Sequence, residues 1–200
     1  GDLFEGDSLT EGASTYWSAV TNRDRIFAHA VDVATSGETI AQIVAEYAAQ
    51  VYPWRPRNGT NAILSVWAGA NDISGIALAT SIAGLSNYYT TARADGFSIV
   101  AFTVLPRSTV APGGVAEGRR AALNYWIRTC GLWDWLVDVA EMFPDCSNTN
   151  FYSDGTHLLY TAQTMVAQRW LSAVKQVPGS LAHADTAITA SKNAGWNVYN

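Results

Sequence analysis

Ser8 lies in the stretch Gly6-Asp7-Ser8-Leu9-Thr10, directly after a short apolar run, Leu3-Phe4. A serine hydroxyl is a weak nucleophile at neutral pH, and it needs a neighbouring base that is itself oriented by a third group. Gly6 lets the chain turn sharply where a strand ends, and a helix beginning after Ser8 would direct backbone N–H groups toward developing negative charge. The stretch therefore predicts a nucleophile beside an oxyanion site, but taken alone it is equally well explained as an ordinary strand-to-helix turn.

Partners of the right chemical type come later, in Asp154-Gly155-Thr156-His157 and at Asn71. A carboxylate three residues before a histidine can reach one ring nitrogen and fix the tautomer, which leaves the other nitrogen for Ser8. The Asn71 side chain and the backbone N–H groups of Gly37 and Ser8 would supply the fixed donors of an oxyanion hole. Asn71 and Gly37 are, one at a time, more often turn residues, and a helix-entry loop explains Asp154 and His157 as well. Their joint occurrence in this order favours catalysis.

The pattern of apolar residues predicts strands that alternate with helices. The run 62–67 is nearly continuous apolar sequence, which is typical of a strand covered on both faces of a parallel sheet. Thr39 and Gln42 fit a capping box, and apolar residues follow them at helical spacing. Strands are expected at 3–4, 30–34, 62–67, 97–105 and 136–139, and helices at 40–51, 81–95, 116–130 and 162–174, with a further helix starting within 16–20.

Such an alternation implies a parallel sheet with right-handed crossovers. Ligands of open parallel sheets bind at the carboxyl ends of the strands, so the loops that follow the first three strands and the loop before the last helix should meet there. The last helix is expected to turn five residues toward the sheet: Ala162, Met165, Val166, Trp170 and Val174.

These motifs resemble those of the SGNH hydrolases, also called the GDSL esterase and lipase family. Gly6-Asp7-Ser8-Leu9, Gly37, Gly69-Ala70-Asn71-Asp72 and Asp154-Gly155-Thr156-His157 match its four named blocks in order, and the likeness extends over roughly residues 2–175. Glu5 in the first strand and Leu158, where many members have proline, depart from the family pattern.

The resemblance implies an α/β fold, a three-layer α/β/α sandwich of flavodoxin-like type with a five-stranded parallel sheet. It also implies catalytic roles for Ser8 as the nucleophile, His157 as the base and Asp154 as the group that orients the base. Ser8, Gly37 and Asn71 would be the oxyanion donors. The expected extent of this hydrolase domain is 1–176, followed by a C-terminal extension at 177–200.

The composition indicates which partners and cofactors are not expected. A net charge of -5 argues against a nucleic-acid partner, because nucleic-acid binders usually carry a basic face. No apolar run reaches the about 20 residues that a membrane span needs. No cluster of His, Cys and carboxylates has zinc-like spacing and no P-loop is present, so neither a metal nor a nucleotide cofactor is expected. Cys130 and Cys146 allow one disulfide or two free thiols. The compartment stays open, a secreted or surface setting included.

The expected function is hydrolysis of an ester through a covalent Ser8 intermediate. The loops beside the expected site, 71–80, 106–114 and 145–153, are rich in small polar residues, with Arg107 as the main cation. No long apolar lid is evident, so the expected substrate is a small molecule or a polysaccharide that carries a short acyl group, foremost acetyl. Two alternatives remain: a lipid or general carboxylesterase, and a non-catalytic carbohydrate-binding or structural module on the same fold.

Overall fold

One parallel sheet forms the centre of the molecule. The computed structural model describes residues 2–12, 15–18, 30–57 and 60–175. Within them the sheet order is β2-β1-β3-β4-β5, and every pair of neighbouring strands is parallel. This confirms the predicted α/β fold with a five-stranded parallel sheet. The strands are β1 (Asp2–Gly6), β2 (Ala30–Asp32), β3 (Ile63–Trp67), β4 (Ser98–Phe102) and β5 (Trp135–Val137).

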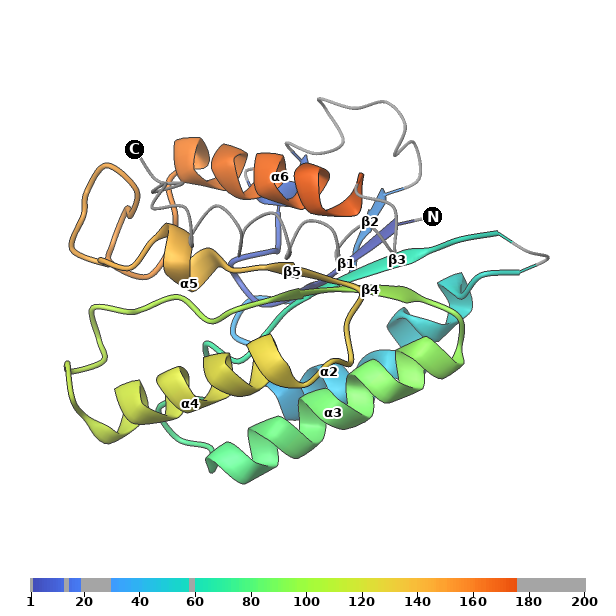
Figure 1. The fold of residues 1–200 in the computed structure, drawn as a ribbon, viewed down its shortest axis with the longest axis horizontal. Coiled ribbons are helices and arrows are strands. Elements are labelled where there is room, and N and C mark those ends of the chain that lie inside the picture. The colour runs from blue at the N-terminus through green and yellow to red at the C-terminus, as the bar shows by residue number, and fades with distance from the viewer. Residues whose placement is uncertain (1, 13–14, 19–29, 58–59, 176–200) are drawn as a thin grey trace, which may run out of the picture.

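Helices cover both faces of this sheet, which gives three layers (Figure 1). The helices α2 (Ile40–Gln50), α3 (Leu78–Ala94) and α4 (Val115–Thr129) pack side by side on one face. The helix α6 (Tyr160–Val174) lies on the opposite face. Two short elements, the 3-10 helix η2 (Tyr52–Trp54) and the helix α5 (Val139–Met142), follow α2 and β5.

The central strand β3 is buried from Leu64 to Trp67, as its apolar sequence predicts. The ring of Trp67 stacks on that of Phe102 in β4, with 5.2 Å between the ring centroids. On the α6 side, the indole N–H of Trp170 donates to the hydroxyl of Ser65 at 2.8 Å. Because a buried indole N–H needs an acceptor, this bond lets a large aromatic ring lie against the sheet without an unsatisfied donor.

Several predicted boundaries differ from the structure. The strand β4 ends at Phe102, although Val104 and Leu105 are as buried as the strand itself. Beyond Phe102 the backbone bonds to a side chain: the N–H of Val104 donates to Asn124 Oδ1 at 2.7 Å, and the carbonyl of Val104 accepts from Asn124 Nδ2 at 2.9 Å. The second strand is shorter than expected, α3 begins three residues earlier, at Leu78, and Val139 starts α5 where a strand residue was expected.

The inner face of α6 is also not the predicted one. Met165 is 41% exposed, so its assignment to the core was wrong. Gln163 is buried instead, because its carboxamide accepts from the N–H of Tyr16 at 3.1 Å and donates to the carbonyl of Leu9 at 3.3 Å. Ala162, Val166 and Trp170 lie in the core as expected, and Val174 packs against it.

Other predictions concern single segments. Residues 8–10 form a turn, so no helix begins directly after Ser8; 16–18 are helical, and 19–20 lie outside the described residues. Both cysteines are free thiols, which excludes the disulfide. The extension 177–200 lies outside the described residues, and its boundary stays a prediction. No helix of the described ranges is long and apolar enough to cross a membrane.

A carboxylic acid is buried in the first strand. Glu5 is 2% exposed; its Oε1 accepts from the N–H of Gly6 at 3.0 Å and its Oε2 from the hydroxyl of Tyr88 at 2.9 Å. Burial disfavours the charged form and raises the pKa of Glu5 to about 8, against the lowering effect of these two hydrogen bonds. Glu5 is therefore protonated at neutral pH.

This predicts a pH-dependent stability. Between the ordinary pKa of 4.5 and the folded value of about 8, the unfolded chain loses the Glu5 proton while the folded chain keeps it, so stability falls as pH rises. Glu5→Gln mimics the protonated acid and should raise the Tm at pH 8 relative to wild type by several degrees, about 2–4 °C per kcal/mol, but not at pH 4.5. Thermal unfolding across this pH range measures the difference. Glu141→Gln, on an exposed glutamate, is the control; equal slopes for wild type and Glu5→Gln would contradict the assignment.

Candidate active site

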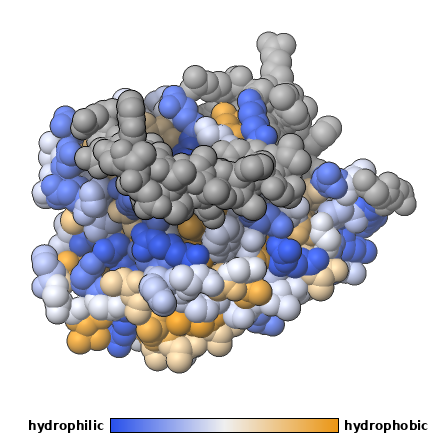
Figure 2. All heavy atoms as spheres, viewed as in Figure 1, coloured by the Kyte–Doolittle hydropathy of each residue, from blue (hydrophilic) through white to orange (hydrophobic). Residues whose placement is uncertain are grey.

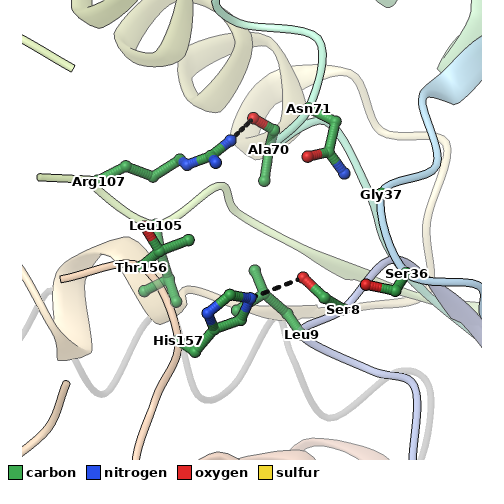
Figure 3. A pocket seen from close by; sticks show the side chains of 10 residues that line it. All are labelled: Ser8, Leu9, Ser36, Gly37, Ala70, Asn71, Leu105, Arg107, Thr156 and His157. Atoms are coloured by element: carbon green, nitrogen blue, oxygen red, sulfur yellow. Dashed lines mark hydrogen bonds between the residues drawn. The ribbon is translucent and has the colours of Figure 1, made fainter. Parts of the chain in front are cut away.

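The loops at the carboxyl ends of the strands enclose a cavity of about 200 Å³ (Figure 3). Four predicted site residues line it, and the fifth, Asp154, lies behind His157. The loops after β1, β2 and β3, the segment beyond β4 and the loop before α6 all contribute. The lining residues are Ser8, Leu9, Ser36, Gly37, Ala70, Asn71, Leu105, Arg107, Thr156 and His157.

Ser8 lies in a tight turn that its neighbour Asp7 holds. The backbone carbonyl of Asp7 accepts from the N–H groups of Thr10 and Glu11, both at 2.9 Å, and its Oδ1 accepts from the N–H of Leu9 at 3.0 Å. With the turn fixed on both sides, the Ser8 side chain points into the cavity, and its Oγ lies 2.9 Å from Nε2 of His157. This is hydrogen-bond distance for transfer of the serine proton.

The other ring nitrogen of His157 faces Asp154. Its Nδ1 lies 2.7 Å from Asp154 Oδ2, while Asp154 Oδ1 accepts from the N–H groups of His157 at 2.7 Å and Thr156 at 2.9 Å. These donors, the backbone N–H of His157 first, lower the pKa of Asp154 to about 2. Asp154 is thus a carboxylate at all ordinary pH values and can hold the histidine with Nδ1 protonated.

The N–H groups of Ser8, Gly37 and Asn71, which were predicted as oxyanion donors, differ in the partners that they have. Neither the Ser8 N–H nor the Gly37 N–H donates to another described residue. Asn71 Nδ2, however, donates to the carbonyl of Glu38 at 2.9 Å and to Asp7 Oδ2 at 3.3 Å. The second bond is long, so it is the weaker of the two. Two free backbone donors and one shared side-chain donor therefore border the nucleophile.

Two buried carboxylates support these loops. Burial raises the pKa of Asp7 to about 6, although the Leu9 N–H and the charges of Arg107 and His157 act in the opposite direction. Asp72 accepts from the N–H of Ile40 at 3.1 Å, at the start of α2. Both thus bond to backbone N–H groups. The described residues contain no group of three or more His, Cys, Asp or Glu side chains that could hold a metal ion.

The model of the GDSL-like lipase/acylhydrolase family matches residues 4–163. This range includes the five predicted site residues: Ser8, Gly37, Asn71, Asp154 and His157. The chain belongs to this family. It is accordingly a carboxylic ester hydrolase. No curated protein matches it.

Solved structures with the same fold agree with this GDSL-like assignment. The acetyl xylan esterase AlAXEase superposes with a TM-score of 0.70 at 13% identity, over 86% of this chain and 98% of the other. The esterase EstA from Pseudoalteromonas sp. gives 0.67 at 13% identity, over 88% and 96%. Axe2, an acetylxylan esterase from Geobacillus stearothermophilus, gives 0.67 at 16% identity, over 86% and 92%. At such identities the likeness concerns the fold.

Sequence reasoning missed part of this GDSL-like site. Leu9, Ser36, Ala70 and Thr156 line the cavity as chain neighbours of predicted residues, so adjacency to the motifs could have indicated them. Arg107 was noted only as a cation in a nearby loop, yet its guanidinium is part of the cavity wall. The expected loop 145–153 contributes no lining residue.

Gly155 tests how strictly the His157 loop is positioned. Its φ is +75°, and an added Cβ would lie 2.5 Å from Ser108 Cβ, in the segment whose Ser108 N–H donates to the Gly155 carbonyl at 2.8 Å. Gly155→Ala should displace Asp154 and His157 and lower kcat/KM for an aryl acetate by about 10²-fold, as misplacement of catalytic groups by about 1 Å can.

Gly113→Ala is the matched control, since Gly113 has a φ of +73° but no atom within 4 Å of an added Cβ. It should cost stability only, about 1–2 kcal/mol for a left-handed residue. A Gly155→Ala protein as active as Gly113→Ala would show that the Ser108 contact does not position the loop.

Proposed function

We propose that the chain hydrolyses esters by a Ser8-His157-Asp154 mechanism. Ser8 Oγ attacks the ester carbonyl while His157 Nε2 takes its proton, and Asp154 holds the resulting imidazolium. His157 then returns the proton to the departing alcohol, and a water molecule, activated in the same way, releases the acid from Ser8. The observation that carries this proposal is the continuous contact chain of 2.9 Å from Ser8 to His157 and 2.7 Å from His157 to Asp154.

The negative charge of the tetrahedral intermediate requires fixed donors. The free N–H groups of Ser8 and Gly37 supply two, and Asn71 supplies a third by giving up its long 3.3 Å bond to Asp7 while it keeps the bond to the carbonyl of Glu38. Asn71 thus exchanges a weak hydrogen bond for a stronger one only when the oxyanion has formed. An interaction that is stronger in the transition state than in the ground state raises the rate, whereas one that is equal in both only improves substrate binding.

Ser8→Ala should abolish hydrolysis of an aryl acetate and labelling by a fluorophosphonate, which reports an activated serine. His157→Ala should lose nearly as much, and the double variant no more, because the two residues act as one unit. Ser36→Ala is the control: Ser36 lines the same cavity, but its hydroxyl bonds to no described residue. Activity that survives in Ser8→Ala, or is lost equally in Ser36→Ala, would contradict the mechanism.

For the substrate, we propose an acetyl ester of a carbohydrate. A cavity of about 200 Å³ is smaller than the about 300–1,000 Å³ of sites for drug-sized ligands, so it suits a short acyl group. Leu9, Ala70 and Leu105 give it apolar surface for a methyl group. Two of the solved structures of this fold are acetyl xylan esterases, which supports the same substrate class.

A lipid esterase is the second candidate, because an apolar groove of about 540 Å³ lies between α2 and α3. Its walls include Ile40, Val44 and Ile76. Hydrophobic side chains also gather along the lower edge of the view in Figure 2, over α3. The groove shares no lining residue with the Ser8 cavity, which favours the short acyl group over a long chain.

A series of aryl esters from acetate to octanoate separates the two candidates. Acetate should be hydrolysed with the highest kcat/KM, because each longer chain exceeds the cavity, and acetylated polysaccharides should release acetate. Val44→Ser in the apolar groove is the control and should leave this order unchanged. Faster turnover of octanoate than of acetate, without acetate release from any glycan, would overturn the proposed substrate in favour of a lipid ester.

A further inference from the structure

The guanidinium of Arg107 forms part of the wall of the Ser8 cavity. The side chain comes from the loop beyond β4 and reaches Ala70, whose carbonyl accepts from Nη1 at 2.6 Å (Figure 3). It lies across the cavity from Ser8 and His157. This single bond to the loop after β3 fixes the guanidinium at the cavity.

Within the described residues, Arg107 has no acidic partner. Arg93, Arg120 and Arg128 each form an ion pair with a carboxylate, whereas no described carboxylate pairs with Arg107. Its Nε is buried without an acceptor among the described residues, and its Nη2 donates to none of them. The edge of the guanidinium formed by Nε and Nη2 is thus unused.

That unused edge has a definite chemistry. A guanidinium presents parallel N–H donors in a rigid plane, which match the two oxygens of a carboxylate. A positive charge that is partly withdrawn from water and lacks a counter-charge is costly, and an anionic ligand removes that cost. The charges of Asp7 and Arg107 interact electrostatically, but the two side chains form no hydrogen bond. The Oδ1 of Asp7 accepts from the Leu9 N–H, and its Oδ2 accepts from Asn71 Nδ2.

We propose that Arg107 binds a carboxylate of the substrate, so that the preferred esters are acetylated acidic sugars of the uronic acid type. This inference rests on the proposed function. An acetyl group carries no charge, so the carboxylate belongs to the alcohol part, the sugar that leaves when Ser8 becomes acylated. Arg107 is then a specificity-determining residue that orients the sugar relative to His157, the donor of the proton to the departing oxygen.

A matched pair of substrates tests this: an O-acetylated methyl glucuronide and the O-acetylated methyl glucoside, which has a hydroxymethyl group in place of the carboxylate. For wild type, kcat/KM for acetate release should be about 10-fold or more higher for the glucuronide, as a charge-assisted hydrogen bond provides. Arg107→Gln should bring the ratio to about 1, because the carboxylate of the glucuronide loses its cationic partner. Arg107→Lys keeps the charge but loses the planar fork, so it should retain only part of the preference.

Arg119→Gln is the control, because Arg119 also donates to carbonyls of the loop after β3, those of Ile73 and Ser74, but does not line the cavity. It should leave the ratio unchanged. Equal losses on both sugars in Arg107→Gln, together with a lower Tm, would make Arg107 a structural link and overturn the inference. So would a wild-type ratio near 1 while aryl acetate is hydrolysed, an outcome that leaves the Ser8 mechanism intact. Failure to hydrolyse even the aryl acetate would instead overturn the proposed function, and the inference with it.

Discussion

The close approach of Gly6 to β3 is the constraint on which the site depends. A Cβ at this position would lie 2.4 Å from the carbonyl oxygen of Trp67 and 2.7 Å from Thr10 Oγ1, so only glycine lets β1 end in contact with β3 and turn at once. The turn that follows places Asp7 in the interior and Ser8 at the cavity. Any side chain at Gly6 would push the nucleophile loop away from the loop that carries Asn71, and the contacts of Asp7 with both would be lost.

Burial and hydrogen bonding give the carboxyl groups of the first strand and the site loops different pKa values. Asp154 is half-exposed, yet its pKa is low because three hydrogen bonds stabilise the anion. Asp7 and Glu5 are buried and their pKa values are raised, because desolvation outweighs their hydrogen bonds. The three carboxyl groups thus have pKa values of about 2, about 6 and about 8 because of their surroundings. Asp154, with the lowest pKa, faces His157, and the protonated Glu5 can lie in the core beside Tyr88 without a buried net charge.

The sequence predicts those parts of the fold that depend on a regular pattern of apolar residues, and it fails where single hydrogen bonds decide the structure. The run 62–67 predicts β3 because burial on both faces selects apolar residues throughout. The same rule extends β4 too far, since Val104 and Leu105 are buried without a strand partner; the bonds to Asn124 that replace the ladder leave no pattern. On α6 the pattern places the apolar Met165 in the core, although it is exposed. It omits Gln163, which is buried, because a polar carboxamide looks like a surface residue in the sequence. Motif spacing brings Ser8, Gly37, Asn71 and His157 to one cavity, but the orientation of Arg107 depends on a single carbonyl 37 residues away in the chain.

Ser8 and His157 meet across 149 residues of sequence, and the helix that directly follows His157 also reaches back, through Gln163, to the backbone of Leu9 and Tyr16. The order of synthesis therefore matters. During synthesis on the ribosome Ser8 is made long before His157, and the two residues can meet only after β5 and α6 have been made and packed. On the proposed mechanism, the growing polypeptide cannot hydrolyse esters before His157 has been made. Hydrolytic activity therefore indicates that the segments carrying Ser8 and His157 have packed together.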